Sequence, residues 1–119
     1  MANGALILTW GNSVRGREGK SLEVFGKALA YYDELAKEGR IHGHREFFAM
    51  TGNAGDRAGT MVVEGDLDEL MKIQTEEKSQ RLLGEAGLIC DNFNVQICEA
   101  ADDQAVGRYL SILGEMGLS

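Results

Sequence analysis

Residues 41 to 64, with the sequence IHGHREFFAMTGNAGDRAGTMVVE, constrain the fold of this chain more than any other stretch. Between residues 41 and 50 aromatic side chains alternate with polar ones, and residues 60 to 64 include a β-branched run, so both segments have strand character. Between them lie Gly52, Asn53, Gly55 and Gly59, residue types that readily adopt the positive φ angles of turns. The stretch therefore predicts an antiparallel hairpin with a long tip.

Helix and strand patterns lie on both sides of this hairpin. Residues 5 to 10 (ALILTW) are apolar on both faces, as is typical of a central strand. Apolar positions at helical spacing follow, with Ser21 as the expected N-cap and Gly39 as the stop. A second helix is expected after Asp66, which forms a capping-box pattern with Glu69. The polar residues 74 to 80 predict that this helix is kinked, broken or exposed in its middle.

The C-terminal part supplies one more strand and one more helix. Residues 91 to 99 (DNFNVQICE) alternate between polar and apolar, which predicts a fourth strand. After Asp102 or Asp103, either of which is a suitable N-cap, one helical stripe carries Val106, Tyr109, Leu110 and Leu113. The order of elements predicts an α+β, ferredoxin-like βαββαβ fold with a C-terminal helix and a four-stranded antiparallel sheet in the order 4-1-3-2.

The two central strands of this sheet have apolar side chains on both faces. Ala5 and Ile7 oppose Leu6 and Leu8 on the first strand, and Val62 opposes its neighbours on the third. Helices cover only one face, so the other would expose an apolar stripe to water. The sequence therefore predicts a homodimer in which two copies pack sheet to sheet.

Composition narrows the classes of function. The 119 residues suit one domain spanning residues 1–119, and the net charge of −7 disfavours nucleic acid and anionic membranes as partners. No apolar run approaches the roughly 20 residues that cross a bilayer. Cys90 and Cys98 are expected to be separate buried thiols. Together these features predict a cytoplasmic protein.

The order of elements resembles the dimeric α/β barrel superfamily of ferredoxin-like proteins. Within it, LAYYDELAKEGRIHGHREFF, the glycine-rich hairpin, MVVEGDLDEL and NFNVQICEA are similar to the YCII-related group. The resemblance implies the fold and dimerisation, and it places the chain among monooxygenases, haem-binding proteins, isomerases and proteins of unknown role. That group has a histidine in the first helix and an Asp-Pro pair, and this chain has neither.

Three polar side chains of the hairpin form the first candidate site. His42, His44 and Glu46 recur at period two, so they are expected on one face of a strand. A histidine there could serve as a general base near neutral pH, with Glu46 as its partner. The alternative is that the three residues hold Zn, Fe or Mn. The third interpretation is an edge strand that is simply polar.

A basic, glycine-rich loop precedes the first helix. The segment GREGKS lacks the first glycine of a phosphate-binding loop, because Val14 occupies that position, so nucleotide hydrolysis is disfavoured. Arg15 and Arg17 could still bind a carboxylate or phosphate beside the N-terminus of the helix. The alternative is a solvated loop.

Aromatic and amide side chains complete the candidate binding residues. Trp10 and Tyr32 could line an aromatic pocket between the sheet and the first helix, together with Tyr31, Phe47 and Phe48, or they could be plain core. Asn94 and Gln96 could orient a ligand from the fourth strand, or they could bond water or the partner subunit.

These observations predict a small homodimer that binds a small, anionic or aromatic metabolite in a cleft between strand two, strand four and helix one. An enzyme would use His42 or His44 as base, Glu46 as partner and Arg15 or Arg17 as anion clamp. The alternative is a non-enzymatic binding or assembly module. The sequence specifies no cofactor.

Overall fold

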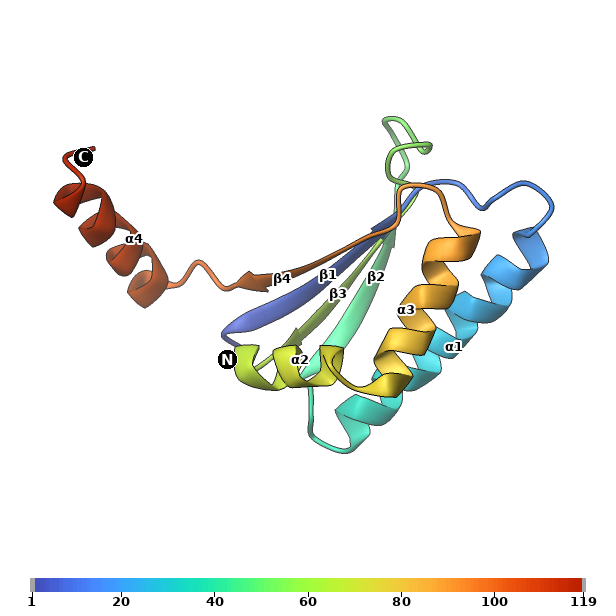
Figure 1. The fold of residues 1–119 in the computed structure, drawn as a ribbon, viewed down its shortest axis with the longest axis horizontal. Helices are drawn as coiled ribbons and strands as arrows, with labels where there is room; N and C mark the ends of the chain where they lie inside the picture. Colours follow the sequence, from blue (N-terminus) through green and yellow to red (C-terminus); the bar gives the residue numbers. More distant parts are fainter. Residues whose placement is uncertain (1, 119) are drawn as a thin grey trace.

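The computed structural model describes residues 2–118, which form one sheet with its helices and one projecting helix (Figure 1). The four strands form an antiparallel sheet in the order β2-β3-β1-β4. This is the predicted ferredoxin-like order, so the sequence-based topology is confirmed. Along the chain the elements are β1 (Gly4–Trp10), α1 (Glu18–Lys37), β2 (Gly43–Phe48), β3 (Gly59–Gly65), α2 (Leu67–Gln74), α3 (Glu77–Ile89), β4 (Asn94–Glu99) and α4 (Asp103–Glu115).

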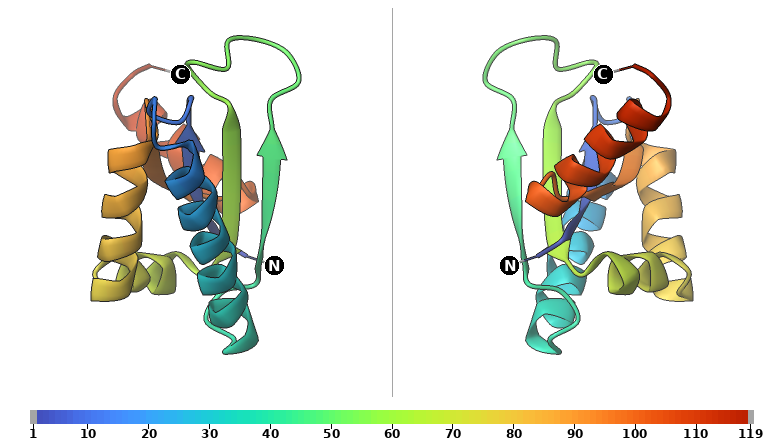
Figure 2. Two further views of the ribbon diagram at one scale, coloured as in Figure 1. Left: turned by 90° about the vertical axis from the view of Figure 1, so that its right-hand side faces the viewer. Right: turned by 90° about the vertical axis from the view of Figure 1, so that its left-hand side faces the viewer.

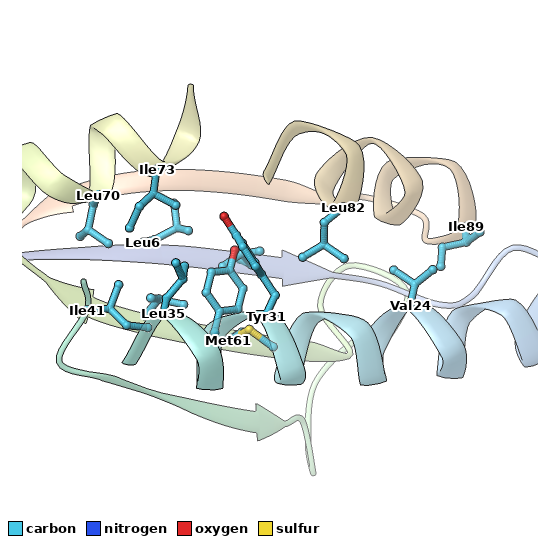
Figure 3. Packing of buried hydrophobic residues seen from close by; sticks show 13 residues of the cluster. Leu6, Val24, Tyr31, Leu35, Ile41, Met61, Leu70, Ile73, Leu82 and Ile89 are labelled. Atoms are coloured by element: carbon cyan, nitrogen blue, oxygen red, sulfur yellow. The ribbon is translucent and has the colours of Figure 1, made fainter. Parts of the chain in front are cut away.

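The core lies between one face of the sheet and α1, α2 and α3 (Figure 3). Even-numbered residues of β1 and odd-numbered residues of β3 form the sheet side of this core. In the register Leu6 lies opposite Val63, and Leu8 lies opposite Met61. These four side chains are at most 4% exposed. The helices contribute the apolar side chains above them, which are Val24, Tyr31, Tyr32, Leu35, Leu70, Ile73, Leu82 and Ile89.

The C-terminal end of β1 and the segment that leads into β3 lie unusually close together. A Cβ atom on Gly59 would lie 2.3 Å from the Trp10 indole, and one on Gly11 would lie 2.2 Å from the carbonyl oxygen of Gly55. Only glycine fits at such distances. The two glycines therefore let the hairpin tip fold over the end of β1, where the Ala58 amide donates to the Trp10 carbonyl at 2.7 Å.

Several helix boundaries differ from those expected. α1 begins at Glu18, three residues before the predicted N-cap Ser21, whose hydroxyl instead accepts a hydrogen bond from Ser13 at 2.9 Å. Asp66 does occupy the N-cap of α2, but its side chain makes no cap hydrogen bond. Asn3 Oδ1 accepts from the Leu67 amide at 2.8 Å in its place.

The predicted capping box does not form because Glu69 has another partner. Arg40, just after α1, donates from Nε to Glu69 at 2.7 Å and from both terminal nitrogens to Glu76 at 2.9 and 2.8 Å. This network ties the end of α1 to the junction between α2 and α3. The junction at Thr75 and Glu76 is the break that the polar middle of the second helical segment predicted.

The outer strands are shorter than their sequence patterns. β2 starts at Gly43 and ends at Phe48, so His42 precedes it, and β4 starts at Asn94. Asn92 has a φ of +54°, which ends the extended run that was expected from residue 91. Cys90 therefore lies at the end of α3 and Cys98 in β4, and both are free thiols.

α4 stands apart from the rest of the fold (Figures 1 and 2). It begins as expected, because the Asp102 carboxylate accepts a hydrogen bond from the Ala105 amide at 2.8 Å. None of its residues is buried. None of the helices within residues 2–118 is long and apolar enough to cross a membrane.

The second face of the sheet carries no helix. The register places Ala5, Ile7 and Val62 on this open face, with Asn94 and Gln96 along the β4 edge and Arg45 along the β2 edge. Its centre is apolar, as the pattern of the two central strands predicted, and its edges carry Asn94, Gln96 and Arg45 together with the aromatic Phe47.

Candidate functional site

His44 and Glu46 lie on the helix-covered face of β2, beside α1. In the register His44 is opposite Val63 and Glu46 opposite Met61, and both of these partners point into the core. His44 Nδ1 lies 2.5 Å from Glu46 Oε2, and His44 Nε2 lies 2.6 Å from Oδ1 of Asp33 on α1. The imidazole therefore connects β2 to α1 with a carboxylate at each ring nitrogen.

The surroundings of His44 favour its protonated form. Its side chain is only 10% exposed, and this burial opposes the charge. The hydrogen bonds to Glu46 and Asp33 outweigh burial, and the net result is a raised pKa for His44. In that state both ring nitrogens donate to carboxylates, so no lone pair is free to take a proton. The geometry therefore describes an ion-paired tie between β2 and α1.

His42 does not join this cluster. It is 47% exposed, and its Nε2 lies 4.0 Å from Asp66 Oδ1. It borders a shallow hollow beside β2, whose lining also includes His44, Arg45, Phe47 and Glu64. The sequence pattern had placed His42 on one strand face with His44 and Glu46, but the strand begins one residue after it.

A metal site gains no support from this arrangement. Within residues 2–118, no group of three or more His, Cys, Asp and Glu side chains is placed to hold a metal ion. His44 and Glu46 are hydrogen-bonded to each other, and His42 Nε2 lies 4.0 Å from Asp66 Oδ1 instead.

The basic loop is far from the histidines. Arg17 is the N-cap of α1, and its Nη1 donates to the Leu88 carbonyl at 3.1 Å, which ties the loop to the end of α3. The Glu18 carboxylate accepts from the Gly16 amide at 2.8 Å, so an acidic group already occupies this backbone donor. Arg15 is exposed. Sixteen residues of helix separate Arg17 from Asp33, or about 24 Å along the axis. One small ligand cannot span both.

Asn94 and Gln96 lie on the opposite face and the opposite edge of the sheet from His44. Their register partners on β1 are Thr9 and Ile7, which face the open side. Three strand spacings, or about 14 Å, separate β4 from β2. The structure therefore does not form the single cleft between strand two, strand four and helix one that the sequence suggested.

Tyr32 is part of the core. It is 0% exposed, its ring centroid lies 6.2 Å from that of His44, and burial raises the pKa of its hydroxyl. That hydroxyl has no protein hydrogen-bond partner among the residues that the structure describes. The neighbouring Tyr31 hydroxyl, in contrast, lies 2.5 Å from Ser79 Oγ.

An apolar, partly open cavity lies on the other side of α1, between the sheet and α3. Its volume is about 60 Å³. Trp10 borders one end, with its ring centroid 5.9 Å from that of Phe25 and the two rings in an edge-on arrangement. Among its lining side chains, Trp10, Ser21 and Cys90 carry an N–H, O–H or S–H group. Its full lining is Leu8, Trp10, Ser21, Val24, Phe25, Ala28, Met61, Leu82, Leu83, Ala86, Ile89, Cys90 and Phe93.

Of the predicted pocket residues, only Trp10 lines this cavity. Phe48 packs against the outer side of Phe25 at a centroid distance of 5.8 Å, and Phe47 lies on the open face of the sheet. Ser21 and Cys90, whose side-chain oxygen and sulfur lie 3.8 Å apart, were not anticipated as pocket residues. They are 69 residues apart, and no sequence motif links them.

The fold is shared with solved structures of low sequence identity. A dimeric ferredoxin-like protein of unknown function from Jannaschia sp. is 16% identical, and the match covers 82% of this chain and 98% of that one with a TM-score of 0.62. SnoaB, a cofactor-independent oxygenase from Streptomyces nogalater, is 11% identical, with coverage of 86% and 96% and a TM-score of 0.61.

A hydroxynitrile lyase from Passiflora edulis has the same architecture at 7% identity, with coverage of 86% and 97% and a TM-score of 0.60. Identities this low show the fold alone. Neither a protein-family model nor a curated protein sequence matches the chain.

Proposed function

We propose that this chain is a homodimeric binding protein for a small apolar, aromatic molecule, which it holds in the cavity between the sheet, α1 and α3. The observation that carries the proposal is the cavity itself. It is lined mainly by apolar side chains from both layers of the fold, and no charged side chain is among them. Pockets of this composition are typical small-molecule sites.

The lining selects the class of ligand. It contains no Lys, Arg, His, Asp or Glu, so a charged group placed inside would lose its hydration without gaining an ion pair. Trp10, Phe25 and Phe93 offer ring edges and faces to another ring. The hydroxyl of Ser21 can bond a single polar substituent. We therefore favour the aromatic over the anionic ligand of the sequence-based prediction.

The cavity must widen to accept a ring. Its 60 Å³ exceeds the roughly 10–15 Å³ that a water needs, but it is below the roughly 150 Å³ of a cavity that binds benzene. Phe25 and Leu83 are only partly buried, so they are the side chains that can move outward. We expect ligand binding to displace them.

Dimerisation is supported by the open face of the sheet. Ala5, Ile7 and Val62 form an apolar centre that no element covers. The similar structures from Jannaschia sp. and from Bacteroides fragilis are described as dimeric. A second copy stacked on this face would bury the stripe in both subunits by a single two-fold operation.

An enzyme with a histidine base, as in the YCII-like hypothesis, gains less support. His44 is shared between two carboxylates, and neither His42 nor His44 lines the cavity. The cavity's own reactive group is the Cys90 thiol. A non-enzymatic assembly module is the second candidate, and the unpacked helix α4 favours it.

The single tryptophan of the chain makes ligand binding directly measurable. Because Trp10 borders the cavity, 4-bromophenol bound there should quench its fluorescence in a saturable manner under excitation at 295 nm. Ala86→Leu fills the cavity and should weaken this quenching at least tenfold. Ala30→Leu makes the same change at an exposed site of α1 and should alter it less than twofold.

Leu83→Ala should have the opposite effect on the quenching of Trp10. It enlarges the cavity and should strengthen the quenching. Equal, non-saturating quenching in all of these variants would show contact at the surface only and would refute the proposed site.

A further inference from the structure

We infer that α4 is a dimer arm, so that each copy of this chain lays the apolar stripe of its α4 on the other copy. This inference rests on the dimer proposed above and adds a second contact to it. The stripe consists of Val106, Tyr109, Leu110, Ile112, Leu113 and Met116. Tyr109 is 62% exposed and Leu110 55%, although side chains of this kind are usually buried.

α4 is amphipathic, whereas a helix surrounded by water needs no apolar face. Gln104, Arg108, Ser111 and Glu115 occupy the side opposite the stripe, at the spacing of one helix face. A helix of 13 residues is marginal in water by itself, and two internal glycines weaken it further. We therefore expect the stripe to pack on an apolar surface.

The helix does not use its own subunit as that surface. It leaves the end of β4 and points away from α1, α2 and α3 (Figures 1 and 2). The radius of gyration is 16.4 Å, whereas a compact chain of 119 residues has about 13.5 Å. Arg108 pairs with Glu99 at the base of the helix, and this contact joins the arm to the edge of the sheet.

A second copy is the occupant that the remaining observations favour. α4 follows the end of β4, where Cys98 lies opposite Ala5 of the open sheet face on which a partner would stack. Two-fold symmetry gives both subunits the same reciprocal contact.

The similar dimeric structures from Jannaschia sp. and Bacteroides fragilis each cover 82% of this chain. The Jannaschia protein is covered over 98% of its length but covers only 82% of this chain. The unmatched 18% of 119 residues is about 21 residues, close to the 20 residues from 100 to 119 that contain α4. The part of this chain that is not matched is therefore about as long as the segment that contains α4.

Matched charge substitutions on the two sides of α4 test the arm. The double variant Leu110→Asp with Leu113→Asp places two charges on the stripe. The double variant Gln104→Asp with Ser111→Asp places two charges on the polar side. In sedimentation velocity over a dilution series, the stripe variant should raise the dimer dissociation constant at least tenfold and the control less than twofold. Far-UV circular dichroism checks that both remain folded.

Hydrogen exchange of the unmodified protein gives a second, independent test. The amides of α4 should be protected above the dimer dissociation constant and should exchange rapidly below it. Protection that persists in the monomer would mean that α4 packs on its own subunit, and absence of protection in the dimer would mean that it packs on nothing. Either result overturns the inference.

The outcomes separate the arm from the rest of the proposal. If the wild-type protein is monomeric at all concentrations, both the proposed dimer and the proposed arm are refuted. If the wild-type protein is a dimer and neither double variant changes its dissociation constant, the arm is refuted. The proposal of stacked sheets then still stands. Neither result bears on quenching of Trp10 by 4-bromophenol, which reports on the cavity alone.

Discussion

Replacement of His44 by glutamine should destabilise the protein in a pH-dependent way. Glutamine keeps a hydrogen-bonding side chain but cannot carry the positive charge that Glu46 and Asp33 stabilise. Because the pKa of His44 is raised in the folded state, its contribution is fully present below the unfolded value of 6.5 and is lost as the pH rises through the folded pKa. The difference between the two proteins should therefore be larger at pH 6 than at pH 9.

The magnitude follows from the exposure of the three side chains. Hydrogen bonds to charged groups contribute about 1.5–3 kcal/mol when they are shielded from solvent. Glu46 is 21% exposed, and its bond lies near the lower end of that range. Asp33 is 72% exposed, so its contribution is about 0.2–1 kcal/mol, and burial of the imidazolium subtracts from the sum. We expect a net loss of about 1–2 kcal/mol at pH 6, which lowers Tm by about 4–8 °C.

Urea unfolding at fixed protein concentration, followed by circular dichroism between pH 6 and pH 9, measures this difference. His42→Gln is the matched control, because His42 is 47% exposed and 4.0 Å from its nearest carboxylate. The control should change the free energy of unfolding by less than about 0.5 kcal/mol at every pH. A His44→Gln effect that is constant or that grows with pH would refute the ion-paired assignment.

Three further perturbations test the packing around the site. Tyr31→Phe removes the buried hydroxyl bonded to a serine and should cost about 1–2 kcal/mol in urea unfolding, whereas Tyr32→Phe removes a buried hydroxyl without a protein partner and should be neutral or stabilising. Gly59→Ala places a Cβ 2.3 Å from the indole and should lower the free energy of unfolding by about 2 kcal/mol or more, with a changed tryptophan spectrum. Arg40→Met should lower Tm at pH 7. This deficit should shrink below about pH 4.5, because the hydrogen bond with Arg40 lowers the pKa of Glu76 and the wild-type advantage disappears once that carboxylate is protonated.

The topology was predictable because burial on two faces leaves a distinct pattern. Leu6 and Leu8 alternate with Ala5 and Ile7 on β1, so no residue of that strand needs solvent, and the central position follows. The polar alternation of β4 likewise marks an edge. Boundaries were less predictable, because the cap of α2 comes from Asn3, a residue 64 positions away in the chain.

The site was less predictable than the fold. Period two correctly placed His44 beside Glu46, but the second carboxylate at its ring belongs to Asp33, an exposed acidic residue in a helix whose register against β2 the sequence does not reveal. Ser21 and Cys90 meet only because α1 and α3 lie side by side on the sheet. Cavities formed by the packing of distant elements leave no local pattern in a sequence.

The strand order also determines when the sheet can be completed during synthesis. β1 ends at residue 10, but β4, which pairs with one side of it, begins at residue 94. At about 5–20 residues per second, the ribosome adds the intervening 84 residues in roughly 4 to 17 s. Throughout that interval one side of β1 has no strand to pair with. A nascent chain stalled before residue 94 should therefore be a substrate for chaperones that recognise extended apolar segments, whereas one stalled after β4 has emerged should be released.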